Sequence, residues 1–263
     1  MLRHLDDLNG YSLRATDGDI GTVKDCYFDD ERWTVRYLVV ETGTWLASRK
    51  VLIAPASVGT PDDEARALPV TITREQVRNS PDIDTDKPVS RQHEIDYLRY
   101  YGYPAYWDSA SLWGAGALPG MMMPESGLMV PTGVGVRETD AALAAEAAAA
   151  HADDDPHLRS CNDVTGYHLK AQDGEIGRVQ GWIVDEQGWA IRYLVVETGH
   201  WWNGHKVLIA PSWITDVSWA ERVVAVSMTQ DAVRDAPEWE SARPPDRAHE
   251  VEIYRHYDRT GYW

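Results

Sequence analysis

The feature that most constrains this chain is an internal repeat. Residues 10–58 and 166–214 align without a gap at a constant offset of 156 positions, and 26 of the 49 aligned pairs are identical. The same register returns near the end of each copy, where Tyr106-Trp107 matches Tyr262-Trp263. Agreement over this length does not arise by chance, so the sequence contains two copies of one folding unit.

The repeat divides the chain into three parts. We expect a first copy over residues 1–107, a linker over residues 108–157 and a second copy over residues 158–263. The linker holds 1 basic and 8 acidic side chains and is rich in Gly, Met, Pro and Ala, a composition typical of a flexible tether. Such a tether would allow the two copies to pack as an internal pseudo-dimer about a twofold axis.

Each copy has the pattern of a series of short strands. In the first copy we expect strands near Leu13 and over residues 23–29, 33–42, 51–54 and 68–72, separated by turns that contain glycine. The longest of these segments is apolar on both faces, which is typical of a strand buried on both sides. Short strands at near-even spacing predict a mainly β fold, with a small closed barrel in each copy.

A short helix and an aromatic segment follow the strands of each copy. Thr73 and Gln76 have the spacing of a helix capping box, and proline ends the helix. The last fifteen residues of each copy are rich in tyrosine and tryptophan. A helix that begins near residue 94 would place Tyr97 and Tyr101 on one face, because residues four apart are neighbours on a helix.

The order of the motifs resembles that of the PRC-barrel family. The motifs are Gly-Tyr-x-Leu, Asp-Gly-x-Ile-Gly, Arg-Tyr-Leu-Val-Val-Glu-Thr-Gly and Lys-Val-Leu-Ile-Ala-Pro, which begin at Gly10, Asp17, Arg36 and Lys50 and recur 156 positions later. The family includes the cytoplasmic part of the photosynthetic reaction centre H subunit, a ribosome maturation factor and soluble bacterial proteins without an assigned role, which this chain resembles most. The resemblance implies a barrel that docks on other macromolecules and shares no active site.

Charge and motif content argue against several functions. The formal net charge is -17, and neither copy shows the basic face that nucleic-acid binding requires. No long apolar stretch and no secretory signal is present, so we expect a cytoplasmic protein without a membrane span. The His93-Glu94 and His249-Glu250 pairs lack further ligands at metal-site spacing. Because no nucleophile or phosphate-loop motif appears either, we expect no enzymatic activity, metal or cofactor.

Aromatic side chains close to cations are the strongest candidates for binding a partner. They occur in two places of each copy, a loop after the longest strand and the aromatic tail. The candidates are Trp45, Lys50, Trp201, Trp202 and Lys206 in the loops, and Tyr101, Trp107, Tyr257 and Trp263 in the tails. Packing of these rings on the parent barrel, as a lid or as an outer layer, is the alternative interpretation.

Three functional hypotheses follow from the sequence. The first is a non-enzymatic cytoplasmic scaffold or adaptor that docks a protein partner. The second is a small-ligand or carbohydrate sensor that uses the loop Trp201-Trp202-Asn203. The third is an accessory role in photosynthetic or membrane electron-transfer complexes, which rests on fold analogy alone.

Overall fold

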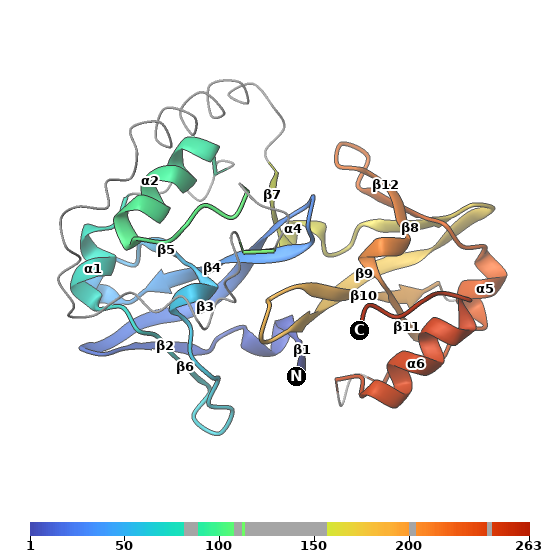
Figure 1. The fold of residues 1–263 in the computed structure, drawn as a ribbon, viewed down its shortest axis with the longest axis horizontal. Coiled ribbons are helices and arrows are strands. Elements are labelled where there is room, and N and C mark those ends of the chain that lie inside the picture. Colours follow the sequence, from blue (N-terminus) through green and yellow to red (C-terminus); the bar gives the residue numbers. More distant parts are fainter. Residues whose placement is uncertain (82–88, 108–111, 114–156, 200–203, 241–243) are drawn as a thin grey trace. The chain divides into compact units, whose positions relative to one another are not determined.

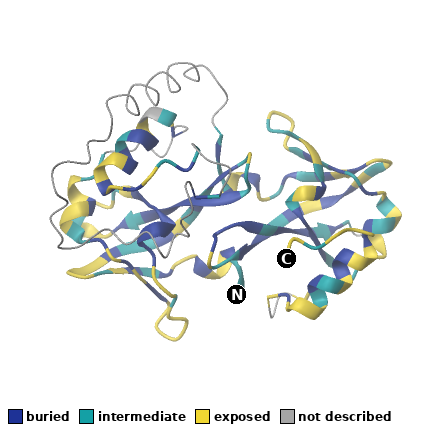
Figure 2. Ribbon diagram, viewed as in Figure 1, coloured by how far each residue is buried: buried dark blue, intermediate teal, exposed yellow. Residues whose placement is uncertain are grey.

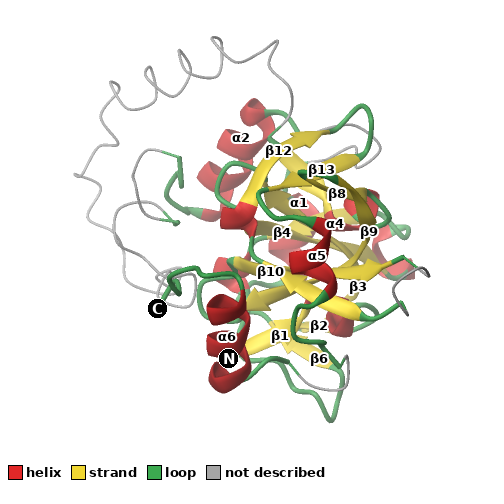
Figure 3. Cartoon of the chain, turned by 90° about the vertical axis from the view of Figure 1, so that its right-hand side faces the viewer, coloured by secondary structure: helices red, strands yellow, loops and turns green. Residues whose placement is uncertain are grey.

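The chain folds into two compact units (Figure 1). The computed structural model describes residues 1–81, 89–107, 112–113, 157–199, 204–240 and 244–263. The first-repeat unit comprises Asn9–Arg159, and the second-repeat unit comprises Met1–Leu8 together with Ser160–Trp263. Strands dominate both units and the helices are short (Figure 3), which confirms the prediction of a mainly β fold.

The sheet of the first-repeat unit has the strand order β5-β4-β3-β2-β6. These strands are β2 (Ser12–Ala15), β3 (Gly18–Asp29), β4 (Thr34–Thr42), β5 (Lys50–Ile53) and β6 (Ala67–Pro69). β3 and β4 form the longest antiparallel pair, in register from Gly21↔Thr42 to Asp29↔Thr34. β4 is buried on both faces, as its continuous apolar pattern predicted.

The second-repeat unit repeats this order with one added strand. Its path is β11-β10-β9-β8-β13-β12. The strands are β8 (His168–Ala171), β9 (Gly174–Asp185), β10 (Ile191–Thr198), β11 (Lys206–Ile209), β12 (Ile214–Ser218) and β13 (Val223–Val226). Five of the six lie 156 positions after a strand of the first unit, to within one residue at their first positions, in agreement with the repeat in the sequence. In both units the strands form the buried layer (Figure 2).

The expected closure of each sheet into a barrel is not seen among the described strands. The ladders of each unit form an open path, in which β5 and β6 lie at the two ends of the first. β5 stops at Ile53, and Pro55 then starts a 3-10 helix over Pro55–Ser57. Because proline has no amide hydrogen, the ladder does not continue at this end of β5.

Among the described residues, four helices follow the sheet strands of the two repeats. They are α1 (Arg74–Asn79) and α2 (Arg91–Tyr101) in the first-repeat unit, and α5 (Gln230–Arg234) and α6 (Arg247–His256) in the second. The Thr73 hydroxyl accepts from the Gln76 amide and the Gln76 side chain accepts from the Thr73 amide, so the predicted capping box is confirmed. Within the described residues, no helix is both long and apolar enough to cross a membrane.

Each unit contains one strand that comes from the other repeat. β1 (Leu2–His4) pairs antiparallel with β9, in register from Leu2↔Asp185 to His4↔Ile183. Its repeat counterpart, β7 (Leu158–Ser160), pairs with β3. The first strand of each repeat is therefore part of the sheet that the other repeat builds.

Matching ion pairs fasten the two exchanged strands. The Arg3 guanidinium lies 2.6 Å from the Glu186 carboxylate, and the Arg159 guanidinium lies 2.8 Å from that of Asp30. The four side chains are mostly buried, which protects both pairs from screening by solvent. The exchange was not expected from the sequence, since alternation marks a strand but does not specify which sheet receives it.

Candidate interaction surface

A buried carboxylate joins the helix, the tail and the sheet of the first-repeat unit. Glu94 of α2 is only 1% exposed. Its carboxylate accepts hydrogen bonds from the hydroxyl of Tyr37 on β4 at 3.2 Å and from that of Tyr106 in the tail at 2.6 Å. Arg91, one helical turn earlier, lies 3.2 Å from the other carboxylate oxygen. Nε2 of His157 lies 2.7 Å from the same oxygen as Arg91. A buried charge is tolerated only when its acceptor sites are filled, and here four groups surround the carboxylate.

The second-repeat unit contains the same arrangement. Glu250 of α6 is 2% exposed and accepts from the hydroxyl of Tyr193 at 2.9 Å and from that of Tyr262 at 2.7 Å. Arg247 lies 3.1 Å from its second oxygen. In both units, therefore, a tyrosine near the end of the tail is bonded to the core of its own unit.

Guanidinium groups and aromatic rings alternate above this carboxylate in the first-repeat unit. Arg36 of β4 pairs with Asp29 of β3 at 2.9 Å, and its guanidinium carbon lies 3.7 Å from the centre of the Tyr106 ring. Arg91 lies 5.7 Å from the same ring and 4.3 Å from the ring of Trp107. The resulting stack holds Trp107 through cation–π contacts.

The stack recurs in the second-repeat unit with similar spacing. Arg192 pairs with Asp185 at 2.8 Å and lies 4.2 Å from the ring of Tyr262. Arg247 lies 5.5 Å from that ring and 4.3 Å from the ring of Trp263. The two copies carry the same residue at all seven positions of this network, which are Asp29, Arg36, Tyr37, Arg91, Glu94, Tyr106 and Trp107 and their counterparts 156 positions later.

Burial keeps the tyrosine hydroxyl groups of the network protonated. Burial raises the pKa of Tyr193, and the neighbouring Glu250 carboxylate raises it further. Burial also raises the pKa of Tyr262, with a further contribution from its hydrogen bond to Glu250. A hydroxyl that resists ionisation remains a hydrogen-bond donor, so both tyrosines continue to donate to the carboxylate at an alkaline pH at which an exposed tyrosine begins to ionise.

The cross-strand aspartate of the second-repeat unit is held ionised. Burial acts to raise the pKa of Asp185, but hydrogen bonds from Arg192 and from the Gln187 and Gly188 amides, with the charge of Arg192, outweigh it and lower the pKa. Arg36 and Arg192 thus each form a cross-strand ion pair with an aspartate of the neighbouring strand.

Of the candidates in the loops, Trp45 is the best defined. It is half-buried, its indole N–H donates to the Ile20 carbonyl at 2.7 Å, and Arg74 of α1 lies 4.3 Å from its ring. Lys50 and Lys206 each start the strand after the loop, where they pair in register with Glu41 and Glu197. Trp201 and Trp202 lie outside the described residues.

The candidates in the tails fall into two groups. Tyr101 and Tyr257 are buried, Tyr101 against Tyr97 and Tyr103 and Tyr257 against Trp213, so their rings form part of the packing of their own units. The side chains of Trp107 and Trp263 are accessible to a partner, since Trp107 is half-buried and Trp263 is 53% exposed. Packing on the parent unit thus describes the two tyrosines, whereas the two tryptophans remain candidates for binding a partner.

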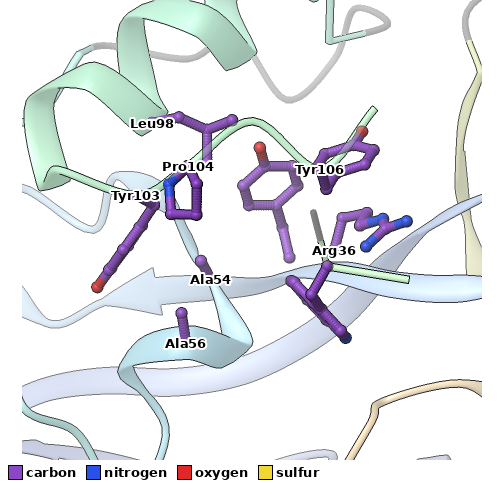
Figure 4. Close-up of a pocket in the computed structure, with 9 residues that line it drawn as sticks. Arg36, Ala54, Ala56, Leu98, Tyr103, Pro104 and Tyr106 are labelled. Atoms are coloured by element: carbon purple, nitrogen blue, oxygen red, sulfur yellow. The ribbon is translucent and has the colours of Figure 1, made fainter. Parts of the chain in front are cut away.

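Pocket size and the grouping of ligand-type side chains are known for the described part of the chain. A pocket beside Arg36, Ala54, Leu98, Tyr103 and Tyr106 (Figure 4) has a volume of about 10 Å³, which is room for about one water molecule. His, Cys, Asp and Glu side chains of the described residues form no group of three that could hold a metal ion.

Comparison with known proteins shows that residues 2–77 match the PRC-barrel domain, as the motif order predicted. The matched range starts at β1, which the structure places in the sheet of the second repeat. PRC-barrel domains are in general modules of protein interaction.

One curated relative is similar to part of the chain. An uncharacterized protein of Deinococcus radiodurans is 31% identical over 84 residues, which is 32% of this chain and 30% of the relative. The match thus spans less than a third of the length of either protein. It assigns no activity to the chain.

Proposed function

We propose that this chain is a non-enzymatic cytoplasmic scaffold or adaptor that docks a protein partner through Trp107 and Trp263. The single observation that carries the proposal is that Trp263 is 53% exposed while two neighbours contact its ring. The guanidinium carbon of Arg247 lies 4.3 Å from the ring centre, and the centre of the Tyr254 ring lies 5.1 Å from it. Tryptophan and arginine dominate the binding energy of protein interfaces. Trp263 and Arg247 together therefore have the composition of an interface hot spot.

Rigidity of the tail supports the same role. Tyr262, which precedes Trp263, is hydrogen-bonded to the buried Glu250, so the tryptophan is carried on a segment that is fixed to the core. A side chain that is ordered before binding loses less conformational entropy when the partner arrives. The formal net charge of -17 favours a partner with a basic surface, since opposite charges increase the rate of encounter.

Affinity capture from native cell extract tests the proposal. We compare the wild-type chain with a Trp107→Ala, Trp263→Ala double variant, and use Tyr100→Ala as the matched control because Tyr100 is also an exposed tail aromatic, 39% exposed. The expected result is a protein that is captured by the wild type and the control and is lost by the double variant. Capture that is equal for all three chains would refute the assigned surface, and capture of no protein would refute the adaptor role.

A further inference from the structure

The two copies of the network differ in what covers the strand arginine. In the first-repeat unit, Nη1 of Arg36 donates to the carbonyl of Leu112 at 2.5 Å, and the ring of Trp113 lies 4.8 Å from the guanidinium carbon. The ring of Tyr106 lies 3.7 Å from the same carbon. With two rings and a carbonyl around it, the Arg36 side chain is 1% exposed.

The same arginine is open in the second-repeat unit. Arg192 lies 4.2 Å from the ring of Tyr262 and donates to Asp185, but its side chain is 24% exposed. Its Nε atom is buried and has no hydrogen-bond acceptor among the described residues. Tyr262 is 38% exposed, whereas its counterpart Tyr106 is buried. This unit thus presents the network without the cover that the first unit has.

We infer that this open face of the second-repeat unit binds a short segment of a partner protein in which a tryptophan follows an apolar residue. The segment Leu112-Trp113 shows how such a peptide sits on the equivalent arginine. On Arg192, the carbonyl before the partner's tryptophan accepts a hydrogen bond from the guanidinium and the indole ring lies over it. The inference rests on the proposed function, because it names the chemistry of the partner for the surface that includes Trp263.

Arginine suits this kind of recognition. Its planar guanidinium offers five donors, stacks on aromatic faces and is weakly hydrated, so an indole ring covers it at low cost. The ion pair with Asp185 fixes the plane of the Arg192 guanidinium before a ligand arrives. Few contacts are involved, so we expect a dissociation constant on the order of 0.1–1 mM for a short peptide.

The Leu112-Trp113 segment covers Arg36 in its own unit. The same segment is therefore not available to bind Arg192. The equivalent arginines therefore carry the same recognition chemistry, with one site occupied by the chain itself and one open.

A peptide with the sequence of residues 109–115 (Ser-Ala-Ser-Leu-Trp-Gly-Ala) is the probe that tests the inference. We label it with fluorescein and titrate it with the full wild-type chain while recording fluorescence anisotropy. The expected result is saturable binding of one peptide per chain. A control peptide with alanine in place of tryptophan should bind at least ten times more weakly, and equal binding of the two peptides would overturn the inference.

Two variants locate the site. Arg192→Met keeps the apolar stem and removes the donors, so the peptide should bind it at least ten times more weakly. Trp113→Ala uncovers Arg36, so the number of peptides bound per chain should rise from one to two; this count decides the outcome if Arg192→Met does not fold. Unchanged affinity for a folded Arg192→Met chain, or a count that stays at one, would overturn the inference.

Failure of the inference is distinguishable from failure of the proposed function. If the peptide does not bind but the Trp107→Ala, Trp263→Ala variant still loses the captured protein, only the assigned peptide chemistry is wrong. If capture survives the double variant, the docking role of the tryptophans is wrong whatever the peptide does.

Discussion

Tyrosine hydroxyl groups are buried in two different ways in the second-repeat unit. The hydroxyl of Tyr193 donates to the Glu250 carboxylate at 2.9 Å. The hydroxyl of Tyr257 is also buried, but it has no hydrogen-bond partner among the described residues. Loss of a donor to a buried charge is costly, whereas loss of an unpaired buried hydroxyl is not.

Phenylalanine substitutions separate these two cases. Tyr193→Phe should lower the free energy of unfolding by about 1.5–3 kcal/mol, because the Glu250 carboxylate loses a donor. Tyr257→Phe should change it by less than about 0.5 kcal/mol, because no hydrogen bond is lost. Urea unfolding followed by circular dichroism measures both values. Equal losses for the two variants would show that the network around Glu250 contributes no specific stability.

Asp185 makes part of the stability dependent on pH. Its pKa in the folded unit is lowered, as hydrogen bonds and the charge of Arg192 outweigh burial. The ionised form therefore stabilises the fold above the unfolded pKa of about 3.9, and this contribution is lost as the pH falls through the folded pKa. Asp185→Asn should be about 1 kcal/mol less stable than the wild type at pH 7, and the difference should shrink below about pH 4.

Urea unfolding at pH 7 and pH 3 measures this difference. Asp216→Asn on the exposed side of β12 is the control, and we expect it to follow the wild type at both values. A difference between Asp185→Asn and wild type that stays constant with pH would contradict the assigned role of the Asp185 charge.

Sequence reasoning found the exposed aromatic residues of the site but not the polar groups beneath them. Neighbours along the chain suggested Lys50 as the cation beside Trp45, whereas Arg74 of α1 is stacked there. Glu94 was considered only as a weak metal ligand. Its actual partners, Tyr37 and Tyr106, lie 57 and 12 positions away, and such contacts have no local pattern. The identity of seven network residues between the two copies was the signal that could have revealed them.

At the scale of elements, the long β3–β4 and β9–β10 pairs depend on two glycines. A Cβ atom on Gly21 would overlap the backbone carbonyl of Glu41, and one on Gly177 would overlap that of Glu197. The clash is with backbone on the neighbouring strand, so a side-chain rotation does not relieve it. These glycines therefore allow the close approach that the ladder requires.

Alanine at either glycine should destabilise its unit. Gly21→Ala or Gly177→Ala should cost about 2–3 kcal/mol, because the strands must separate locally to accept the methyl group. Gly199→Ala is the matched control, since the neighbour nearest to its Cβ atom, the Ile176 carbonyl oxygen, would be at an ordinary 3.7 Å. Thermal unfolding measures all three. A loss for Gly199→Ala as large as for Gly177→Ala would contradict the close-approach explanation.

Elements were predicted more successfully than their pairing. The strands, the capping box at Thr73 and a helix with Tyr97 and Tyr101 on one face were all evident from periodicity and capping residues. The open path of each sheet and the exchange of β1 and β7 were not. Period and capping are local properties, whereas the choice of a neighbouring strand depends on contacts that are distant in the sequence.

At the scale of the whole molecule, the exchanged strands join the two repeats in addition to the covalent linker. Residues 1–8 belong to the second-repeat unit, although they start the first repeat, and β7 pairs with β3 although it starts the second. Cutting the chain between the repeats should therefore leave two fragments, each of which contributes a strand to the other.

Cleavage of the linker tests this connection. A protease site inserted between Gly133 and Val134 should give, after cleavage, two fragments that still elute together in gel filtration. Arg3→Glu with Arg159→Glu should promote their separation, because each reversed charge then faces Glu186 or Asp30. Adding Glu186→Arg and Asp30→Arg should restore association. Cleaved wild-type fragments that elute separately would show that the exchanged strands do not hold the repeats together.

The measurement that tests the central claim most directly is a titration of the purified, captured partner with single variants of the chain. Isothermal calorimetry with Trp107→Ala, Trp263→Ala and the control Tyr100→Ala gives a dissociation constant for each. The account predicts that at least one tryptophan variant binds about 30-fold or more weakly, a loss of about 2 kcal/mol, while Tyr100→Ala binds like the wild type. Wild-type affinity in both tryptophan variants would contradict docking through the arginine-braced tryptophans.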